Sequence, residues 1–180
     1  MLDCFSSTGG FSLHIAQRAK ARVESMEGVE SSDLAIATAK ANAEANGLSG
    51  IEFHKADVFD YLSGLRAAKS GGEAPYSTII LDPPAFAKSR KQLEDAERGY
   101  KDINYRALRL LGPGGILVTC SCSHHVGESM LLEIVAQAAI DAGKTIRVLE
   151  RRVQAADHPI LLTVPETLYL KCLILEVLPD

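Results

Sequence analysis

The chain has 180 residues and opens with the stretch MLDCFSSTGGF, residues 1–11. Its first five residues are mostly apolar and predict a short buried strand, and the Ser, Thr and Gly residues behind them predict a tight turn. A helix is expected directly after the turn, over residues 11–19. This order of strand, glycine-rich turn and helix decides the fold, because it recurs along the rest of the chain.

Further strands and helices follow from the hydrophobic pattern and the turn residues. The strands are expected over residues 23–30, 51–57, 76–82, 116–121, 145–153 and 167–178, and the helices over 33–46, 58–68, a segment ending at 111, and 128–142. Strands joined through helices form right-handed crossovers in a mostly parallel sheet, whereas the last two strands are expected to pair antiparallel at an edge. The fold class is therefore α/β, with residues 1–180 in one domain and helices on both faces of the sheet.

Capping and turn residues predict where some of the helices and strands begin and end. Ser31 or Ser32 is expected to cap the second helix, and Gly47 to end it. The sequence GPGG at residues 112–115 predicts a turn ahead of the fifth strand.

Composition limits the class of protein. The chain is 47% hydrophobic and 23% charged, as soluble globular domains are. None of its apolar runs approaches the roughly 18 residues of a membrane span. We therefore expect no membrane partner, no secretory leader and a cytoplasmic location, with the four cysteines reduced. The formal net charge of −4 argues against a general polyanion-binding surface but leaves room for a local basic patch.

Three acidic residues, Glu30, Asp57 and Asp82, each end a predicted strand of the parallel series. Ligands of open α/β sheets bind at that carboxyl edge, where an acid can accept hydrogen bonds from ribose hydroxyls. The turn supplies Gly9 and Gly10, but neither a G-x-G-x-x-G fingerprint nor a Walker lysine. An adenosine-containing ligand without a pyrophosphate, S-adenosylmethionine, fits best, although each acid alone could be a loop residue or a helix cap. The expected cofactor-binding residues are Phe5, Ser6, Ser7, Thr8, Gly9, Gly10, Phe11, Glu30, Asp57, Val58 and Asp82.

The motif DPPAF, residues 82–86, follows a very apolar strand. Its two prolines stiffen the turn and can hold Asp82 and Phe86 against a flat substrate. An enzyme that methylates amino groups would typically have an aromatic residue directly after the prolines. Ala85 stands there instead, which weakens that interpretation without excluding it.

The motif TCSCS, residues 119–123, follows the neighbouring strand and is expected beside DPPAF. A thiolate there could add to C6 of a pyrimidine and so activate C5 for methylation, with Asp82 as the acid near N3. Such a thiol must be partly ionised, for which a nearby cation or the N-terminus of the helix beginning near Gly127 is suited. Spacing alone leaves open whether this thiol belongs to Cys120 or Cys122.

Several motifs together resemble the ribosomal RNA large subunit methyltransferase I family: LDCFSSTGGF, DPPAF, RGYKDIN, GGILVTCSCS and QAADHPI with the following PE and YLK. The resemblance covers essentially the whole chain. It implies an S-adenosylmethionine-dependent enzyme that forms 5-methylcytidine in large-subunit ribosomal RNA. It also implies the class I methyltransferase fold with a seven-stranded sheet. Full-length members carry an N-terminal PUA-type RNA-binding domain and a β-rich linker, which we expect to be missing from this chain.

The resemblance also implies residue roles. The catalytic cysteine of the family is the one between two serines, which is Cys122 here, and Cys120 inherits no role. Lys101 and Asp102 of RGYKDIN, and Asp157 and His158 of ADHP, are expected near the substrate. With Asp82 as the second catalytic residue, the expected substrate-binding residues are Pro83, Pro84, Phe86, Lys101, Asp102 and His158. The basic group Lys88, Arg90 and Lys91 could be a solvated surface or a contact with RNA phosphates.

Other interpretations stay open beside this one. Cys120, Cys122 and His124 could form a zinc cluster, but the spacing is unusual and no second ligand group appears, so no metal is expected. Cys4 and Cys172 are expected in the core. The chain could instead methylate amino groups of RNA or protein, or bind S-adenosylmethionine without catalysis. Exposed edge strands also make a homodimer an expectation.

Overall fold

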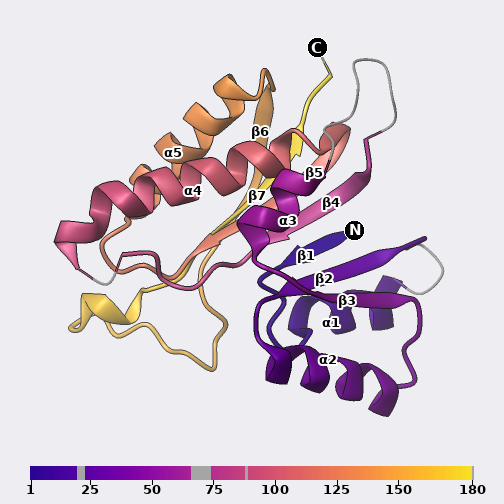
Figure 1. Cartoon of the computed structure of the whole chain (residues 1–180). Coiled ribbons are helices and arrows are strands. Elements are labelled where there is room, and N and C mark those ends of the chain that lie inside the picture. The colour runs from indigo at the N-terminus through magenta and orange to yellow at the C-terminus, as the bar shows by residue number, and fades with distance from the viewer. Residues whose placement is uncertain (20–22, 66–73, 88, 180) are drawn as a thin grey trace.

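The computed structural model describes residues 1–19, 23–65, 74–87 and 89–179, in which strands and helices alternate along the chain (Figure 1). The strands are β1 (Leu2–Cys4), β2 (Met26–Glu30), β3 (Ile51–Lys55), β4 (Tyr76–Leu81), β5 (Leu111–Ser121), β6 (Ile146–Arg152) and β7 (Lys171–Val177). The α-helices are α1 (Gly10–Ala19), α2 (Asp33–Ala45), α3 (Val58–Gly64), α4 (Leu93–Leu108) and α5 (Glu128–Asp141). Short 3-10 turns, η2 (Arg90–Gln92) and η3 (Pro165–Thr167), precede α4 and β7. The alternation expected from the sequence is confirmed.

The strands form one seven-stranded sheet in the order β3-β2-β1-β4-β5-β7-β6. Strands β1 to β5 pair in parallel, whereas β7 is antiparallel to both β5 and β6. The strand order reverses between β1 and β4, which is where open sheets of this kind bind ligands. The expected α/β fold and the antiparallel pairing of the last two strands are confirmed, with β6 at the edge and β7 one strand inside it.

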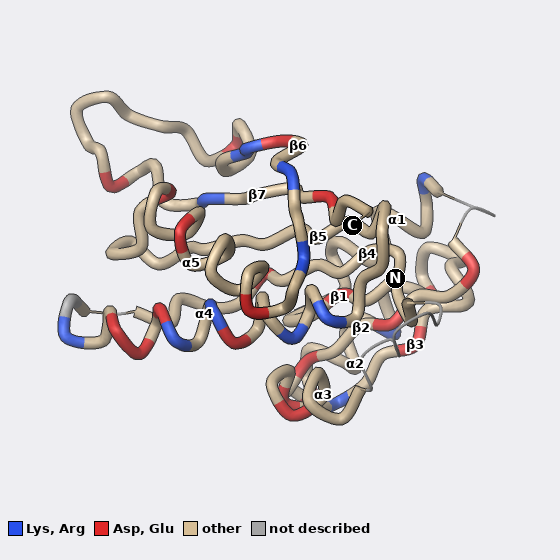
Figure 2. Tube along the Cα trace, turned by 90° about the horizontal axis from the view of Figure 1, so that it is seen from above, with Lys and Arg blue, Asp and Glu red and all other residues tan. Residues whose placement is uncertain are grey.

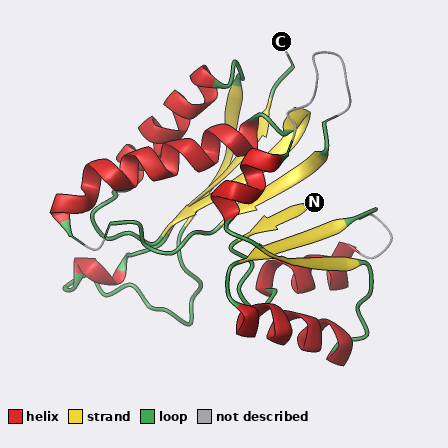
Figure 3. Ribbon diagram, viewed as in Figure 1, coloured by secondary structure: helices red, strands yellow, loops and turns green. Residues whose placement is uncertain are grey.

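Helices cover both faces of the sheet (Figure 3). α3, α4 and α5 pack side by side on one face, over the largest buried cluster, which includes Leu2, Ile79 and Leu117. α1 and α2 lie on the other face, where Ile36 of α2 packs near Phe53 of β3. Burying each such side chain contributes about 1.5–3 kcal/mol, so packing on both faces stabilises the sheet.

The ends of α2 follow the residues that predicted them. Ser32 is the N-cap, and its hydroxyl accepts a hydrogen bond from the Ala35 N–H at 3.3 Å. Gly47 lies beyond the end of the helix with a φ of 63°, a left-handed conformation that glycine adopts without strain. Both expectations are confirmed.

The sequence predicted that the GPGG turn would separate α4 from a strand beginning at residue 116. The structure does not have this separation. β5 already begins at Leu111, which pairs with Tyr76, and the pairing resumes at Ile116 opposite Thr78. The residues between them form an irregularity in which Gly114 has a φ of 77°. The turn therefore bulges from the strand ladder without ending it.

Several other elements differ in extent from their predictions. β2 begins at Met26 rather than 23, and α4 ends at Leu108 rather than 111. β7 begins at Lys171 rather than 167, because Thr167 belongs to the η3 turn. α3 ends at Gly64, and Leu65 is extended; the remainder of the predicted helix, residues 66–68, lies outside the described residues. Among the helices of the described residues, none combines the length and the hydropathy required to cross a bilayer.

Candidate active site

The loops that follow β1 to β5 meet at one edge of the sheet, because these strands point in the same direction (Figure 1). β6 also points this way, since it is antiparallel to β7, so the loop between β6 and β7 starts at the same edge. Residues from Phe5 to Lys171, far apart in sequence, are therefore neighbours in space. This carboxyl edge is the candidate active site.

The loop after β1 has an unusual backbone. Phe5 and Ser7 both have a positive φ, 61° and 48°, which non-glycine residues rarely adopt. Gly9 also has a positive φ, 86°, and a Cβ added there would lie 3.2 Å from the Phe53 ring. A Cβ at Gly10, by contrast, would meet nothing within 4 Å. Strain of this kind concentrates at ligand sites, and the open space at Gly10 leaves the backbone accessible to a ligand.

Glu30, at the end of β2, ties this loop to the start of α2. One carboxylate oxygen accepts a hydrogen bond from the Ser7 N–H at 3.1 Å. The other accepts from the N–H groups of Ser31 at 2.7 Å and Ser32 at 3.1 Å, and from the Ser31 hydroxyl at 3.2 Å. Glu30 thus has a structural role, and the oxygen bonded to Ser7 retains acceptor capacity that could receive a ribose hydroxyl.

Asp57 combines exposure with a capping role. It is the N-cap of α3, and its Oδ1 accepts hydrogen bonds from the N–H groups of Phe59 at 2.8 Å and Asp60 at 3.1 Å. Val58, the next residue, is buried in the core. Asp57 is therefore a helix cap, as one of the two interpretations of its sequence position predicted. Its other carboxylate oxygen, Oδ2, could accept a hydrogen bond from a ligand.

Asp3 is a site residue that the sequence reasoning missed. Its carboxylate is completely buried in β1, and Oδ2 accepts hydrogen bonds from the Ser12 hydroxyl at 2.6 Å and the Ser12 N–H at 3.1 Å. Oδ1 has no hydrogen-bond partner among the described residues. Burial raises the pKa of Asp3 to about 6, and the nearby Asp82 carboxylate adds to the rise. An acid inside the apolar run MLDCF was the signal that could have revealed it.

The DPPAF loop follows β4 and lies beside β1 at the carboxyl edge of the sheet. Asp82 is partly buried directly after β4, and burial raises the pKa of its carboxyl group. Pro83 is buried and Pro84 exposed. The ring of Phe86 packs at 4.7 Å from that of Tyr100 and at 6.4 Å from that of Phe5. Phe86 therefore joins the DPPAF loop to the loop after β1.

The two cysteines of TCSCS occupy different environments. Cys120 is 2% exposed within β5, where it stands opposite Cys172 of β7. Cys122 lies past the end of β5, partly exposed, with its Sγ 3.8 Å from the carbonyl oxygen of Pro83. Only Cys122 of this pair combines exposure with contact to the DPPAF loop.

The serines on either side of Cys122 anchor it to α4. Ser121 donates a hydrogen bond from its hydroxyl to the Tyr100 hydroxyl at 3.0 Å, and the hydroxyls of Ser123 and Tyr100 are also 3.0 Å apart. The Ser123 hydroxyl further accepts a hydrogen bond from the Ala87 N–H at 3.3 Å. All three hydroxyl groups belong to buried residues, so this network fixes the backbone that carries Cys122. Tyr100 is a second residue that the sequence reasoning missed, although it lies inside RGYKDIN.

Lys171, the first residue of β7, is a third residue of the candidate site that the sequence reasoning missed. Its ammonium group donates hydrogen bonds to the carbonyl oxygens of Ser123 at 2.7 Å and Tyr169 at 2.9 Å. Burial, and after it the charge of Asp82, raises the pKa of the Cys122 thiol, while the Cys122 N–H and the Lys171 charge lower it. The motif YLK was the available sequence signal.

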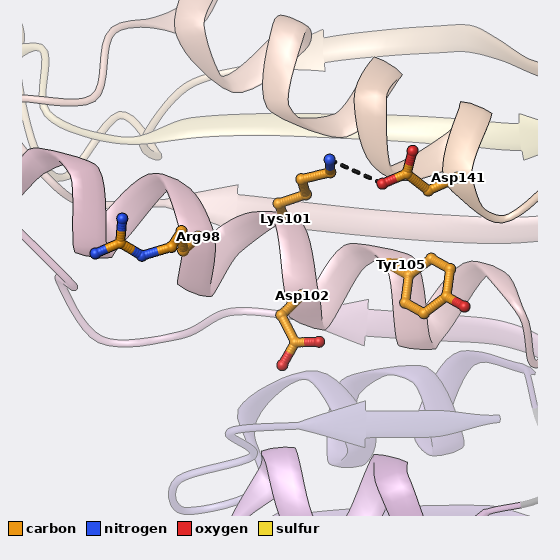
Figure 4. A pocket seen from close by; sticks show the side chains of 5 residues that line it. All are labelled: Arg98, Lys101, Asp102, Tyr105 and Asp141. Atoms are coloured by element: carbon orange, nitrogen blue, oxygen red, sulfur yellow. Dashed lines mark ion pairs between the residues drawn. The ribbon is translucent and has the colours of Figure 1, made fainter.

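Lys101 and Asp102 make their contacts elsewhere. Lys101 forms an ion pair with Asp141 at 2.8 Å, and Asp102 forms one with Arg106 at 2.8 Å. Lys101, Asp102 and Asp141 line a cavity of about 350 Å³ against α4 (Figure 4). Acidic and basic residues alternate along α4 rather than forming a basic stripe (Figure 2). The structure therefore does not bring these two residues together with Asp82 and Cys122.

The remaining predicted residues lie at the edge or outside the described part. His158 is exposed in the loop between β6 and β7, with its Nδ1 3.1 Å from an Asp157 carboxylate oxygen and its ring 6.2 Å from that of Tyr169. Lys88 and the side chain of Arg90 lie outside the described residues. Within the described ranges, no group of three or more His, Cys, Asp or Glu side chains is arranged to hold a metal ion.

Comparison with known proteins agrees with this fold. A family model described as a methyltransferase domain matches residues 1–152. A Shewanella denitrificans protein named Ribosomal RNA large subunit methyltransferase I is 45% identical over 179 residues, and one of the same name from Aeromonas salmonicida is 45% identical over 178. Each alignment covers 98% of this chain and 43% of the relative, so the chain spans less than half of their length.

A solved structure shares the fold. It is a candidate S-adenosylmethionine-dependent methyltransferase from Streptococcus mutans, with a TM-score of 0.80 and 21% identity. The match covers 98% of this chain and 44% of that protein. The resemblance first indicated by the motifs is confirmed, and the chain belongs to the methyltransferase domain family.

Proposed function

We propose that this chain transfers a methyl group from S-adenosylmethionine to C5 of a cytosine in large-subunit ribosomal RNA, through a covalent bond between Cys122 and C6. The observation that carries the proposal is the position of the Cys122 thiol against the carbonyl of Pro83, next to the partly buried acid Asp82. The names of the curated relatives support the choice of RNA.

The residues at the carboxyl edge fit the cofactor. Open space at Gly10 admits a ligand close to the backbone, and the unpartnered Oδ1 of Asp3 is a buried polar atom in the strand beneath the same loop. Phe5 to Phe11, Glu30, Asp57, Val58 and Asp82 would hold S-adenosylmethionine, with Glu30 suited to ribose hydroxyls and Asp57 to the adenine amino group. When bound, the cofactor supplies an electrophilic methyl group on a sulfonium.

Cys122 and Asp82 would divide the chemistry on the base. The Cys122 thiol loses its proton to water, and the thiolate forms a bond to C6 while the C5–C6 double bond opens. Asp82 offsets the negative charge by protonating N3, a role that its raised pKa favours. C5 then takes the methyl group, with S-adenosylhomocysteine as the leaving group. A base removes the C5 proton, and the C5–C6 double bond re-forms as the C6–S bond breaks and releases the Cys122 thiolate. N3 returns its proton to Asp82.

The base must leave its stack to reach Cys122. C6 of a cytosine within a helix is not accessible to a thiol on a loop, so the target nucleotide would be unpaired or flipped out. Pro83, Pro84 and Phe86 form the stiff ledge on which the flat base would lie. His158 lies on the loop between β6 and β7, which begins at the same edge and could contact the RNA beside it.

The test is methyl transfer under single-turnover conditions, with this 180-residue chain in excess over unmodified large-subunit ribosomal RNA. Excess protein removes the need for tight RNA binding. Using labelled S-adenosylmethionine and mass spectrometry of digested nucleosides, we expect the label in 5-methylcytidine. Asp82→Asn should slow the transfer by about 100-fold, as loss of an acid–base group does.

The alternatives give different results in the same assay. A methyl group on an exocyclic amino group of the RNA, or on protein, would identify an amino-group methyltransferase in which the cysteines are idle. Binding of S-adenosylmethionine in a calorimeter without any labelled product would identify a non-catalytic binding domain. Either result contradicts the proposal.

A further inference from the structure

Strand register places the backbone of Lys171 at the end of β5, next to the residue that precedes Cys122. Lys171 begins β7 directly opposite Ser121, the last residue of β5, and Cys122 follows Ser121. Because this pairing continues through the ladder to Ile116 and Glu176, the sheet fixes the backbone of Lys171 at the end of β5. From there its ammonium group reaches the carbonyl oxygen of Ser123, the residue after Cys122, at 2.7 Å.

The ammonium group of Lys171 is held by carbonyl oxygens rather than by an acid. It donates hydrogen bonds to Ser123 and Tyr169, and it forms no ion pair with a carboxylate among the residues that the structure describes. Lys55 and Lys101, by contrast, are paired with Asp33 and Asp141. The positive charge of Lys171 is therefore not neutralised by a neighbouring anion.

Several groups face the Cys122 thiol, and they act in opposite directions. Asp82, on the loop after β4, disfavours a second negative charge whenever its carboxyl group is ionised. Tyr100 of α4 and Cys120 of β5 are neutral neighbours whose own pKa values are raised. Lys171 of β7 is the cation of this set. Burial lowers the pKa of Lys171, and the charge of Cys122 opposes that shift, so the interaction between the two groups is reciprocal.

We propose that Lys171 is a positioning residue that stabilises the thiolate of Cys122 and so compensates for burial and for the charge of Asp82. The inference deepens the proposed function and rests on it for the role of Cys122. When the thiol ionises, its proton passes to water, and Lys171 keeps all three of its own protons. Its hydrogen bond to the Ser123 carbonyl also holds the backbone on the far side of the nucleophile.

The test is the rate at which iodoacetamide alkylates Cys122 from pH 6 to 10, followed by peptide mass spectrometry, without RNA or cofactor. Lys171→Met should shift the profile to higher pH and slow alkylation at pH 7.5 by about 3- to 10-fold, because a neighbouring cation lowers a thiol pKa. Lys171→Arg should restore most of the rate. Lys144→Met, beyond the end of α5 at the opposite edge of the sheet, should match the wild type.

Lys171→Gln separates charge from folding, because it keeps a hydrogen-bond donor while removing the charge. It should behave like Lys171→Met, with circular dichroism unchanged. The inference is overturned if the Met and Gln variants keep the wild-type pH profile, or if they lower the rate equally at every pH. Methyl transfer measured in parallel distinguishes the two proposals: if Cys122→Ala still methylates RNA while the alkylation profile depends on Lys171, the proposed function fails and the inference about the thiol stands.

Discussion

At the scale of single residues, burial distinguishes Cys120 from Cys122 as the candidate nucleophile, which their spacing in the sequence could not do. Cys120 is 2% exposed within the β5–β7 pairing, and its contact with Cys172, together with burial, raises its pKa. Cys122 lies one step beyond the strand, where the thiol contacts the DPPAF loop. Their position relative to the strand end, rather than their chemistry, therefore makes Cys122 the candidate nucleophile.

The hydroxyl of Tyr100 is expected to matter for both stability and rate. Tyr100→Phe removes its contacts with Ser121 and Ser123 and leaves their buried hydroxyls with fewer partners. We expect the free energy of unfolding in urea to fall by about 1–3 kcal/mol and kcat for methyl transfer to fall with it. Tyr105→Phe is the matched control on α4, where the exposed hydroxyl accepts a hydrogen bond from Arg109 at 3.4 Å, and it should change neither quantity. Equal effects of the two variants would contradict this role.

Asp3 predicts a pH dependence of stability. Its pKa is raised from 3.8 to about 6, so the folded state binds the proton more tightly than the unfolded state. Ionisation of Asp3 therefore costs nothing below about pH 4, and costs an increasing amount up to pH 6, reaching roughly 3 kcal/mol above it. Asp3→Asn, which avoids this cost, should gain stability relative to the wild type between pH 4.5 and 7.5 in urea unfolding. A difference that does not change with pH would contradict the assignment.

At the scale of elements, the loop after β1 assigns different tasks to its two glycines. Gly9 has a φ of 86° and packs against Phe53, so its task is to permit the turn. Gly10 begins α1 and faces open space, so its task is to leave room. Gly9 therefore serves the fold, and Gly10 is the position at which we expect a ligand to approach the backbone.

Two alanine substitutions separate these tasks. Gly9→Ala should lower the free energy of unfolding by about 1–2 kcal/mol, because a left-handed conformation is strained for any residue with a Cβ. Gly10→Ala should leave stability unchanged or slightly higher, while binding of S-adenosylhomocysteine in a calorimeter weakens by at least about tenfold, or roughly 1.4 kcal/mol. Wild-type affinity in Gly10→Ala would show that the ligand does not approach this backbone.

The elements were more predictable from sequence than the contacts between them. The strand and helix order followed from hydrophobic periodicity, and the cap at Ser32 from its side chain. The GPGG bulge was missed because a local turn signal does not reveal that strand pairing continues on both sides of it. Lys171 and Tyr100 were missed because their partners are 48 and 23 residues away, across strand and helix packing.

At the scale of the whole molecule, the sheet order assembles the site. β1 and β4 are neighbours at the reversal of the sheet, which sets the loop after β1 beside DPPAF, and the pairing of β5 with β7 brings Lys171 to the end of β5 that precedes Cys122. The site therefore draws on residues from Asp3 to Lys171, which is nearly the full chain. Lys101 and Asp102 share the RGYKDIN motif with Tyr100, yet they face another side of α4 and form surface ion pairs.

The central claim, a covalent bond between Cys122 and the target cytosine, is tested most directly with RNA containing 5-fluorocytidine. Fluorine at C5 prevents the final loss of the C5 substituent, so the adduct persists. The account predicts a denaturant-resistant complex whose cross-linked peptide carries the RNA on Cys122, retained in Cys120→Ala and lost in Cys122→Ala. An adduct on Cys120, or methylation of ordinary RNA without any adduct on the fluorinated RNA, would contradict it.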